Sequence, residues 1–307
     1  MKNEWRINIL ESELLATVAT VVREGSFERA AAILNITPSA VSQRVRLLEE
    51  RVGSVLVVRG QPCIATQAGA RVCRHADTVA LLEEDLRRDM PTLLPEVNHR
   101  MHSTLRIAIN ADSLASWFIP AMQAFCSQSS TLLDVVLDDQ EQTGEWLRRG
   151  QVLAAVSAER TAVQGCRSHK LGALRYVATA SPAFVARHFA HGLNADSLMR
   201  APSLIFDRND QLQQQWVRKL TRKNIALPAH RLPSPQAFID ATSAGVGWGM
   251  NLLSAVQHQL QTGQLIALDG ARTLDVPLYW QVTKLPLPSL QSLTRCVLEA
   301  SHAALIS

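Results

Sequence analysis

The beginning of the chain divides into three short amphipathic segments. Apolar residues recur every three or four positions from Glu11 to Glu24, which predicts a helix that Gly25 ends. Ser26 is a suitable N-cap for a second helix, Phe27 to Leu34, whose alanines allow another helix to approach closely. Thr37-Pro38 predicts the start of a third helix, because threonine caps well and proline is tolerated at the first helical position.

The second and third predicted helices form a helix-turn-helix pattern, since a tight break joins them and the latter opens with small polar residues. Val41, Val45 and Leu48 form its buried stripe, so glutamine and arginine lie on the other face. Glutamine can bind adenine, arginine can bind guanine, and hydroxyl groups can bind phosphate. A helical bundle with a polar outer face is the alternative. We expect contacts with double-stranded DNA from Ser26, Thr37, Ser39, Ser42, Gln43, Arg44, Arg46 and Arg59.

A longer amphipathic segment follows at 67–90, where apolar residues recur at helical spacing until Pro91. In a helix that connects two domains, the same helix of a second subunit can cover this stripe, since twofold pairing is the commonest oligomeric arrangement. We therefore expect a homo-oligomer, a dimer or tetramer, on palindromic DNA, because a twofold pair places two recognition helices about 34 Å apart. Packing of the stripe onto its own domain is the alternative. The expected interface residues are Val72, Val79, Leu82 and Leu86.

Strands and helices alternate beyond a polar, proline-marked segment at 91–103, which we interpret as a hinge. Strands are predicted at 105–109, 132–137 and 152–157, with helices at 117–126 and 141–149 between them. A second set starts with a strand at 176–180, and the chain ends in a helix at 289–305. The pattern predicts an α/β fold with a parallel sheet, preceded by an all-α helix-turn-helix domain.

Acidic and hydroxyl side chains follow several of these strands, where open α/β sheets bind their ligands. A cluster of acids favours a cationic ligand, and hydroxyl groups with helix N-terminal amides can bind a carboxylate. Aspartate is also a common helix cap, which is the alternative for each acid. The candidate effector-binding residues are Asn110, Asp112, Ser113, Asp139, Ser157 and Asp207.

Composition argues against a transmembrane or a secreted protein. With 307 residues, 47% of them hydrophobic, the chain can fill more than one core. No apolar run exceeds five residues, and Met1 to Glu4 opens no signal-peptide hydrophobic region. The five cysteines are odd in number and lack CxxC spacing, which indicates neither a disulfide framework nor a zinc site. We expect a cytoplasmic protein that does not engage the membrane.

The distribution of charge is more informative than the net charge of +4. Between Arg23 and Arg74 there are eight arginines, no lysines and four glutamates. The planar, permanently charged guanidinium suits phosphate and guanine. The segment is therefore suited to nucleic acid, with a solvated basic face as the alternative.

Motifs for catalysis and metal binding are absent from the sequence. The glycines from Gly245 to Gly249 lack the GxGxxG spacing of a nucleotide loop, and there is no GxSxG or Walker motif. The pairs His99-x-x-His102 and His188-x-x-His191 have no further ligands at motif spacing. We expect no enzymatic activity, no catalytic residues, no metal and no cofactor other than a small-molecule effector.

The N-terminal motifs resemble the DNA-binding domain of LysR-type transcriptional regulators. The resemblance implies a winged helix-turn-helix domain at 1–66, a dimerising linker helix at 67–90, a hinge at 91–103 and RNA polymerase as a partner. It also implies a two-lobed, periplasmic-binding-protein-like (type 2) effector domain at 104–307, with lobe I at about 104–174 and 275–307 and lobe II at about 175–274. The runs that carry it are Ser26 to Ala31, Ile36 to Val45, Leu48-Glu49, Gly53, the wing strands Val55 to Arg59 and Ile64 to Thr66, and Thr66 to Gly69.

Four further runs look like the arginine/lysine-export regulators, the ArgP/LysG subgroup of the family. This resemblance implies an activator that senses lysine or arginine and controls an exporter gene. It leaves open an inhibitor of chromosome initiation or a nucleoid- or origin-binding protein. A thiol-based sensor, in which Cys126 and Cys166 meet, is a second alternative. The runs are Asn110 to Ala115, Leu147 to Gly150, Lys170 to Leu174, and Ala201-Pro202 with Phe206-Asp207.

Overall fold

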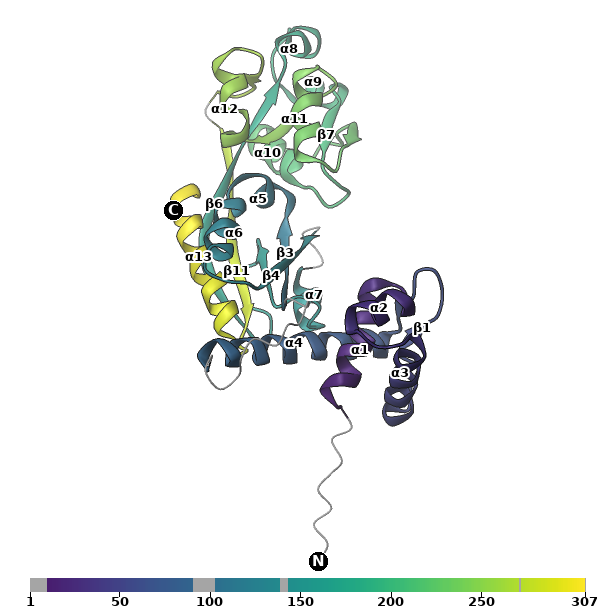
Figure 1. Cartoon of the computed structure of the whole chain (residues 1–307). Coiled ribbons are helices and arrows are strands. Elements are labelled where there is room, and N and C mark those ends of the chain that lie inside the picture. Colours follow the sequence, from purple (N-terminus) through teal and green to yellow (C-terminus); the bar gives the residue numbers. More distant parts are fainter. Residues whose placement is uncertain (1–9, 91–102, 139–142, 271, 307) are drawn as a thin grey trace, which may run out of the picture. The chain divides into compact units, whose positions relative to one another are not determined.

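The computed structural model describes residues 10–90, 103–138, 143–270 and 272–306 (Figure 1). The chain forms two compact units. The smaller unit contains residues 1–105, 129–134 and 286–290, and the larger contains 106–128, 135–285 and 291–307. Most of the predicted hinge, 91–102, and the predicted effector residue Asp139 lie outside the described residues. In the described part of the chain, no helix has the length and apolar character needed to cross a membrane.

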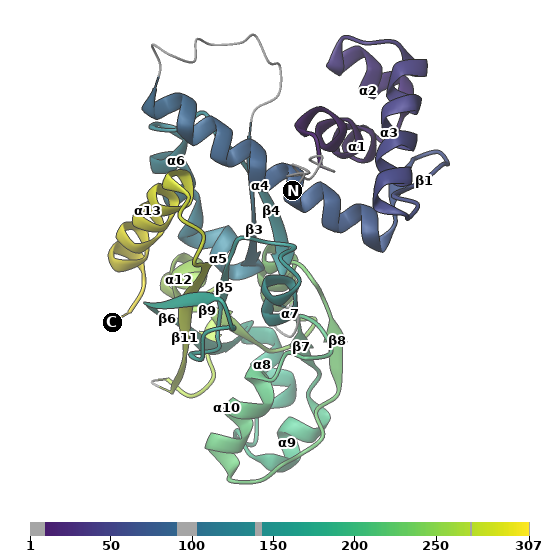
Figure 2. The same cartoon turned by 90° about the horizontal axis from the view of Figure 1, so that it is seen from below.

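The smaller unit contains the three predicted helices at nearly the expected positions. They are α1 (Ser12–Glu24), α2 (Phe27–Leu34) and α3 (Pro38–Val52). Ser26 Oγ accepts a hydrogen bond from the amide of Arg29, and Thr37 Oγ1 accepts one from the amide of Ala40. These caps satisfy amides that have no partner within the helix, which is why α2 and α3 begin where they do. Figures 1 and 2 show α1, α2 and α3 packed together beside the first part of α4 (Gln67–Asp89).

The wing is shorter than the sequence predicts. Its antiparallel strands are β1 (Val57–Val58) and β2 (Ile64–Ala65), with two residues each. The carboxylate of Glu49 accepts hydrogen bonds from the amides of Leu56 and Val57, at 2.8 and 3.2 Å. The amide of Leu56 is therefore not available to extend the β1–β2 ladder. At the same end of the ladder, Thr66 lies opposite Leu56, and its Oγ1 accepts the amide of Gly69 and starts α4. Side-chain hydrogen bonds therefore limit both strands.

The core of the smaller unit comes from the predicted apolar stripes, and the side chains of Val18, Val21, Ala30, Val41 and Leu48 are essentially inaccessible. Ala76 of α4 belongs to the same core, and Val72 packs against it. The first half of the α4 stripe is therefore covered by its own domain. Further along α4, Leu82 and Leu86 are 46% and 50% exposed.

The larger unit is built around one seven-stranded sheet, whose strand order is β10-β6-β11-β5-β3-β4, with β9 also paired to β6. A separate two-stranded sheet joins β7 and β8. The elements are β3 (Thr104–Asn110), α5 (Ala111–Ser116), α6 (Phe118–Cys126), β4 (Leu132–Asp138), α7 (Thr143–Arg148), β5 (Ala154–Ser157), β6 (Cys166–Ala180), α8 (Pro182–His188), α9 (Ala195–Arg200), β7 (Ser203–Ile205), α10 (Leu212–Thr221), β8 (Ala229–Arg231), α11 (Pro235–Ser243), β9 (Gly249–Leu252), α12 (Leu253–Gln261), β10 (Ile266–Ala267), β11 (Thr273–Thr283) and α13 (Pro288–Ala304).

The prediction of an α/β fold is confirmed, but the expectation of a parallel sheet is wrong for β6 and β11, whose described pairings are antiparallel. The β3–β5 pair is parallel, whereas β6 pairs antiparallel with β9, β10 and β11. The physical reason is that β6, with 15 residues, and β11 run side by side as long antiparallel neighbours. The sequence indicated only the last part of β6, because polar residues interrupt its apolar pattern before Tyr176.

Two lobes lie at the ends of these long strands (Figure 1). One contains β3, β4 and β5 with α5, α6, α7 and α13, and the other contains α8 to α12 with β7 and β8. Arg175 and Asp275, where the sequence suggested that the chain crosses between lobes, face each other on β6 and β11. Their side chains form a bidentate ion pair at 2.7 and 2.8 Å. This hydrogen-bonded pair holds the pKa of Asp275 below its usual range.

Candidate functional site

The recognition face predicted for DNA lies on the outer side of α3. Val41, Val45 and Leu48 are buried, whereas Ser39 and Gln43 are exposed. This division follows from the helical period, which places residues three and four apart on one side. The hydroxyl groups of Thr37 and Ser39 lie 2.9 Å apart at the N-terminus of the helix. Hydroxyl groups and free amides at such a terminus are suited to a DNA phosphate.

Arginines of this face are held by neighbouring acids. Arg44 Nη2 lies 2.7 Å from Glu13 Oε2 of α1, and Arg46 Nε lies 2.9 Å from Glu50 Oε1 on its own helix. Ser42 is half-buried beside them. Exposed pairs of this kind contribute little to stability, so either arginine can exchange its acid for a nucleic-acid partner at small cost.

A groove between α2 and the wing adds a second candidate phosphate contact, and Ser26 and Arg59 both line it. The guanidinium carbon of Arg59 lies 5.1 Å from the centre of the Phe27 ring. This cation–π contact orients the arginine without neutralising its charge. The structure thus brings Ser26 and Arg59 together, and it adds Arg29, which also lines the groove and was not singled out from the sequence.

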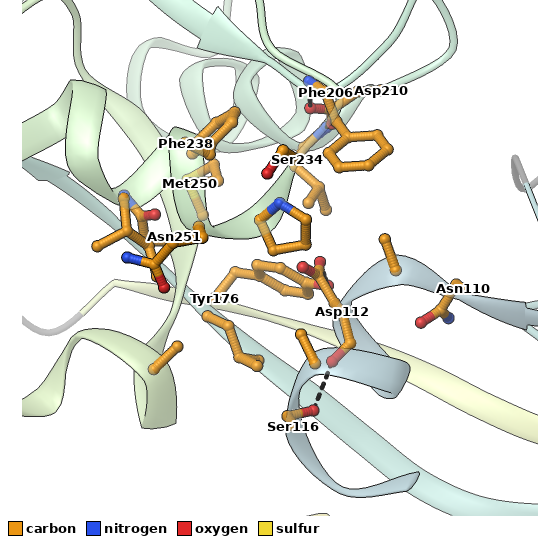
Figure 3. Close-up of a pocket in the computed structure, with 18 of the residues that line it drawn as sticks. Asn110, Asp112, Ser116, Tyr176, Phe206, Asp210, Ser234, Phe238, Met250 and Asn251 are labelled. Atoms are coloured by element: carbon orange, nitrogen blue, oxygen red, sulfur yellow. Dashed lines mark hydrogen bonds between the residues drawn. The ribbon is translucent and has the colours of Figure 1, made fainter. Parts of the chain in front are cut away.

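The larger unit contains a cavity of about 330 Å³, which is shown in Figure 3. Side chains from both lobes line it, and α5, β6 and β9 each contribute. It lies beyond the carboxyl end of β3, where open α/β sheets bind their ligands. The lining residues are Asn110, Ala111, Asp112, Ala115, Ser116, Tyr176, Phe206, Asp207, Asn209, Asp210, Leu212, Ser234, Pro235, Gln236, Phe238, Ile239, Met250, Asn251, Leu252 and Ala255.

Asp112 and Tyr176 form the central polar contact of the cavity. The hydroxyl of Tyr176 donates to Asp112 Oδ2 at 2.5 Å. Burial raises the pKa of Asp112, the Tyr176 hydrogen bond lowers it, and the nearby charge of Asp210 raises it again. Burial and the Asp112 carboxylate raise the pKa of Tyr176 well above its usual range, so the phenol keeps its proton and remains a donor.

A second acidic group comes from the loop between β7 and α10. Asp207 Oδ1 accepts the amides of Asn209 and Asp210, at 2.7 and 2.9 Å. Asp210 in turn accepts the amides of Phe206 and Leu212, at 2.9 and 3.0 Å, so both carboxylates are fixed by backbone donors. Burial raises the pKa of Asp210 despite these hydrogen bonds, and the charge of Asp207 adds to the increase.

The cavity therefore presents carboxylates without counter-ions. Asp112, Asp207 and Asp210 line it, and the lining as far as the structure describes it contains no lysine, arginine or histidine. Desolvated acids repel one another and are stabilised by a cation that enters between them. Met250, Phe206 and other apolar side chains cover the remaining wall, which suits a cation carried on an aliphatic stem.

The predicted effector residues divide into two groups. Asn110, Asp112 and Asp207 line the cavity, and Asn110 Oδ1 also caps α5 by accepting the amide of Ser113 at 2.7 Å. Ser113 and Ser157 do not line the cavity, so their predicted contact with the ligand needs correction. Ser113 is fully buried, and Ser157 Oγ accepts the amide of Glu159.

Several cavity residues were missed from the sequence. Tyr176 opens the predicted strand at 176–180, whereas the strand-end rule considers only the residues after a strand. Asn251 lies on β9, whose antiparallel pairing with β6 was not expected, and Asp210 stands three residues beyond Asp207. If the sequence had shown that β6 pairs with β9, it would have indicated that Tyr176 and Asn251 lie close together. In that pairing Tyr176 is opposite Leu252, and Val177 is opposite Asn251.

Comparisons with known proteins match both parts of the chain. Residues 12–70 match the bacterial regulatory helix-turn-helix protein, lysR family, and residues 98–301 match the LysR substrate binding domain. The chain is 42% identical to the HTH-type transcriptional regulator ArgP of Pseudomonas fluorescens over 272 residues, 89% of this chain and 90% of the relative. It is 36% identical to the lysine export transcriptional regulatory protein LysG of Corynebacterium efficiens, over 95% of this chain and 98% of the relative.

A solved structure supplies a comparison with a bound molecule. Full-length LysG from Corynebacterium glutamicum with bound effector Arg has a TM-score of 0.67 and 35% sequence identity to this chain. The match covers 97% of this chain and all of the LysG chain. The similarity therefore extends over the helix-turn-helix unit and the unit that contains the acidic cavity.

Proposed function

The chain belongs to the LysR family of transcriptional regulators, and from that premise we propose that it senses a basic amino acid, arginine or lysine, and controls the gene of an amino-acid exporter. The observation that carries the proposal is the cavity in which Asp112, Asp207 and Asp210 face no basic side chain among the described residues. The names of the LysG relatives, one for lysine export and one with bound arginine, support the same ligand class.

The chemistry of the cavity fits such a ligand in two respects. An ammonium or guanidinium group can bind between carboxylates whose ionised forms burial disfavours, which offsets the cost of keeping them charged. The ligand carboxylate needs donors, and the hydroxyl of Ser234 with the amide of Gln236 at the start of α11 can supply them. The donors for the ligand carboxylate are thus on α11, and the acids for its cationic groups come from both lobes, with Asp112 on α5 and Asp207 and Asp210 between β7 and α10.

The regulatory output would pass through DNA. In this proposal a twofold oligomer binds palindromic sites through α3, and the effector changes how the bound regulator acts on RNA polymerase. Differential affinity of the effector for two arrangements of the lobes is the minimum requirement for such a response.

The experiment is calorimetry of the full chain with L-arginine, L-lysine and two analogues whose side chains are uncharged, L-citrulline and L-norleucine. We expect the basic amino acids to bind far more tightly than the two analogues, and Asp112→Asn should weaken their binding about thirtyfold or more, since truncating a buried paired charge costs about 2 to 5 kcal/mol. Asp196→Asn is the matched control, because Asp196 is exposed and also stands second in a short helix. No heat with either basic amino acid would exclude the ligand class.

The two alternatives would give different results. A nucleoid- or origin-binding protein would leave the same genome-wide footprints with and without lysine. A thiol sensor is less favoured because burial raises the pKa of Cys166, which reduces the thiolate that oxidation requires. A thiol reagent that altered DNA binding would support it nonetheless.

A further inference from the structure

Asn251 has its side-chain amide fixed by two threonines at the wall of the cavity. It lies on β9, lines the cavity and is 3% exposed. Its Nδ2 donates to Thr179 Oγ1 of β6 at 2.9 Å and to Thr242 Oγ1 of α11 at 3.2 Å. Figure 3 shows Asn251 and Asp112 on opposite sides of the Tyr176 ring. The amide therefore faces the cavity from a different wall than the carboxylate of Asp112.

The orientation of this amide follows from its neighbours. The hydroxyl of Thr242 donates its proton to the carbonyl oxygen of Phe238 at 2.7 Å, so towards Asn251 it can only accept. A flipped amide would set its oxygen against a hydroxyl oxygen with no proton to give, which is unfavourable. The nitrogen must face Thr242, and both of its N–H groups are used by the threonines. Among the described residues, no donor pairs with Asn251 Oδ1, which is left as an acceptor.

We propose that Asn251 is a specificity-determining residue whose Oδ1 accepts an N–H from the effector, with Thr242 and Thr179 as the positioning residues that present it. The proposal rests on the proposed function, since it concerns the same cavity. It assigns the second nitrogen-bearing group of the ligand: the carboxylates neutralise one cationic group, and a neutral, fixed acceptor receives an N–H of the other.

This arrangement explains a preference for amino acids with nitrogen at both ends. Arginine and lysine offer N–H donors on the α-carbon and at the end of the side chain. An amino acid with an apolar side chain of the same length would leave either the carboxylates or the Asn251 oxygen unpaired in a desolvated site. Sites built to hydrogen-bond a ligand group discriminate strongly against ligands that lack it.

The first test is a cycle with Asn251→Leu and three ligands: L-arginine, L-norleucine, which has no nitrogen in its side chain, and 5-guanidinopentanoate, which lacks the α-amino group. In the variant we expect arginine to bind about tenfold more weakly or worse, as for loss of a hydrogen bond to a charged group. The affinity ratio of arginine to one of the two analogues should shrink by the same factor, because only the contacted group loses its partner. A purely structural role of Asn251 would weaken all three ligands alike, and that result would overturn the proposal.

The second test concerns the positioning residues and does not alter Asn251. Thr242→Val removes the acceptor that orients the amide, so arginine affinity should fall, and Thr242→Ser should restore it. Thr221→Val is the matched control, because Thr221 also donates to the carbonyl four residues earlier, at 2.8 Å, but is not among the cavity-lining residues. Equal arginine affinity of Thr242→Val and the wild-type protein would overturn the positioning role.

The two proposals can fail separately. If the wild-type chain binds neither arginine nor lysine, the proposed function fails and this inference fails with it. If the wild-type chain binds arginine and Asn251→Leu keeps both affinity ratios, only the inference fails. Thermal unfolding of each ligand-free variant shows whether a weaker affinity arises from a damaged fold.

Discussion

Gly69, in the first turn of α4, lies directly against the carbonyl of Leu56, and a Cβ atom added to it would overlap that oxygen. The contact joins the start of α4 to the beginning of the wing. Thr66 reinforces the junction, because its hydroxyl donates to the carbonyl of Val55 at 2.7 Å and accepts the amide of Gly69 at 3.0 Å. The position of the wing thus depends on a glycine two residues into α4.

The first prediction is that Gly69→Ala destabilises the N-terminal unit by about 1 to 3 kcal/mol, the usual cost of forced overpacking. The clashing atom belongs to the backbone, so no side chain can move aside. Thermal unfolding followed by circular dichroism measures the change. Gly144→Ala is the control, because its nearest neighbours are the flexible end of Arg148 at 3.3 Å or more. Equal stability of the two variants would show that the close approach is relieved at no cost.

The second prediction concerns α3. Gln43→Ala should cost about 1 to 3 kcal/mol of binding free energy on the specific site if Gln43 binds a base edge, with little change on random DNA.

Arg44 of the same helix must leave Glu13 before it reaches DNA. Arg44→Ala should therefore lose less DNA affinity than the same change at an arginine that has no ion pair. Arg51→Ala is the matched control, since Arg51 of the same helix forms an ion pair of the same 2.7 Å length with Glu11. Fluorescence anisotropy with both DNA types gives the values, and an equal loss on both would assign a phosphate contact instead.

Much of the helix-turn-helix unit could be predicted because its signals are local. Ser26, Thr37 and Pro38 mark helix starts by their own chemistry, and the buried stripe of α3 follows from a period within one helix. The wing strands were overestimated, since the hydrogen bonds of Glu49 that shorten β1 come from another element. Such a contact is invisible to a pattern that considers only neighbouring residues.

The cavity could be predicted only on the side where strand ends are followed by helices. Asp112 comes directly after an apolar strand and was found, and Asp207 was found in the same way. Tyr176 and Asn251 meet the cavity through antiparallel pairing of β6 with β9, whose partners are seventy or more positions apart. Ser113 was overestimated because the strand-end rule gives no information about which side of the following helix turn is buried.

The third prediction concerns the exposed half of α4. If a second subunit covers Leu82 and Leu86, the double change Leu82→Asp with Leu86→Asp would bury unpaired charge at the interface, and smaller particles should appear in sedimentation. The fold of the subunit should survive, because both side chains are about half exposed within it. Met199→Asp, at a position 46% exposed on α9, controls for the change of an exposed apolar residue to aspartate. Unchanged mass of the double variant would place the subunit contact elsewhere.

The last prediction is that arginine binds more tightly as pH rises through the elevated pKa values of Asp112 and Asp210. Burial raises both, so the empty cavity holds protons that ordinary aspartates would already have lost. A cationic ligand favours the ionised acids, so binding must release protons in that pH range.

The raised pKa values have the opposite effect on the stability of the ligand-free protein. Between the ordinary and the raised pKa, the native state binds more protons than the unfolded state, so the free energy of unfolding falls as pH rises through this window. Asp112→Asn should reduce both slopes. Calorimetry in buffers of different ionisation heats counts the protons, and binding without proton release would show that the acids are already ionised in the empty cavity.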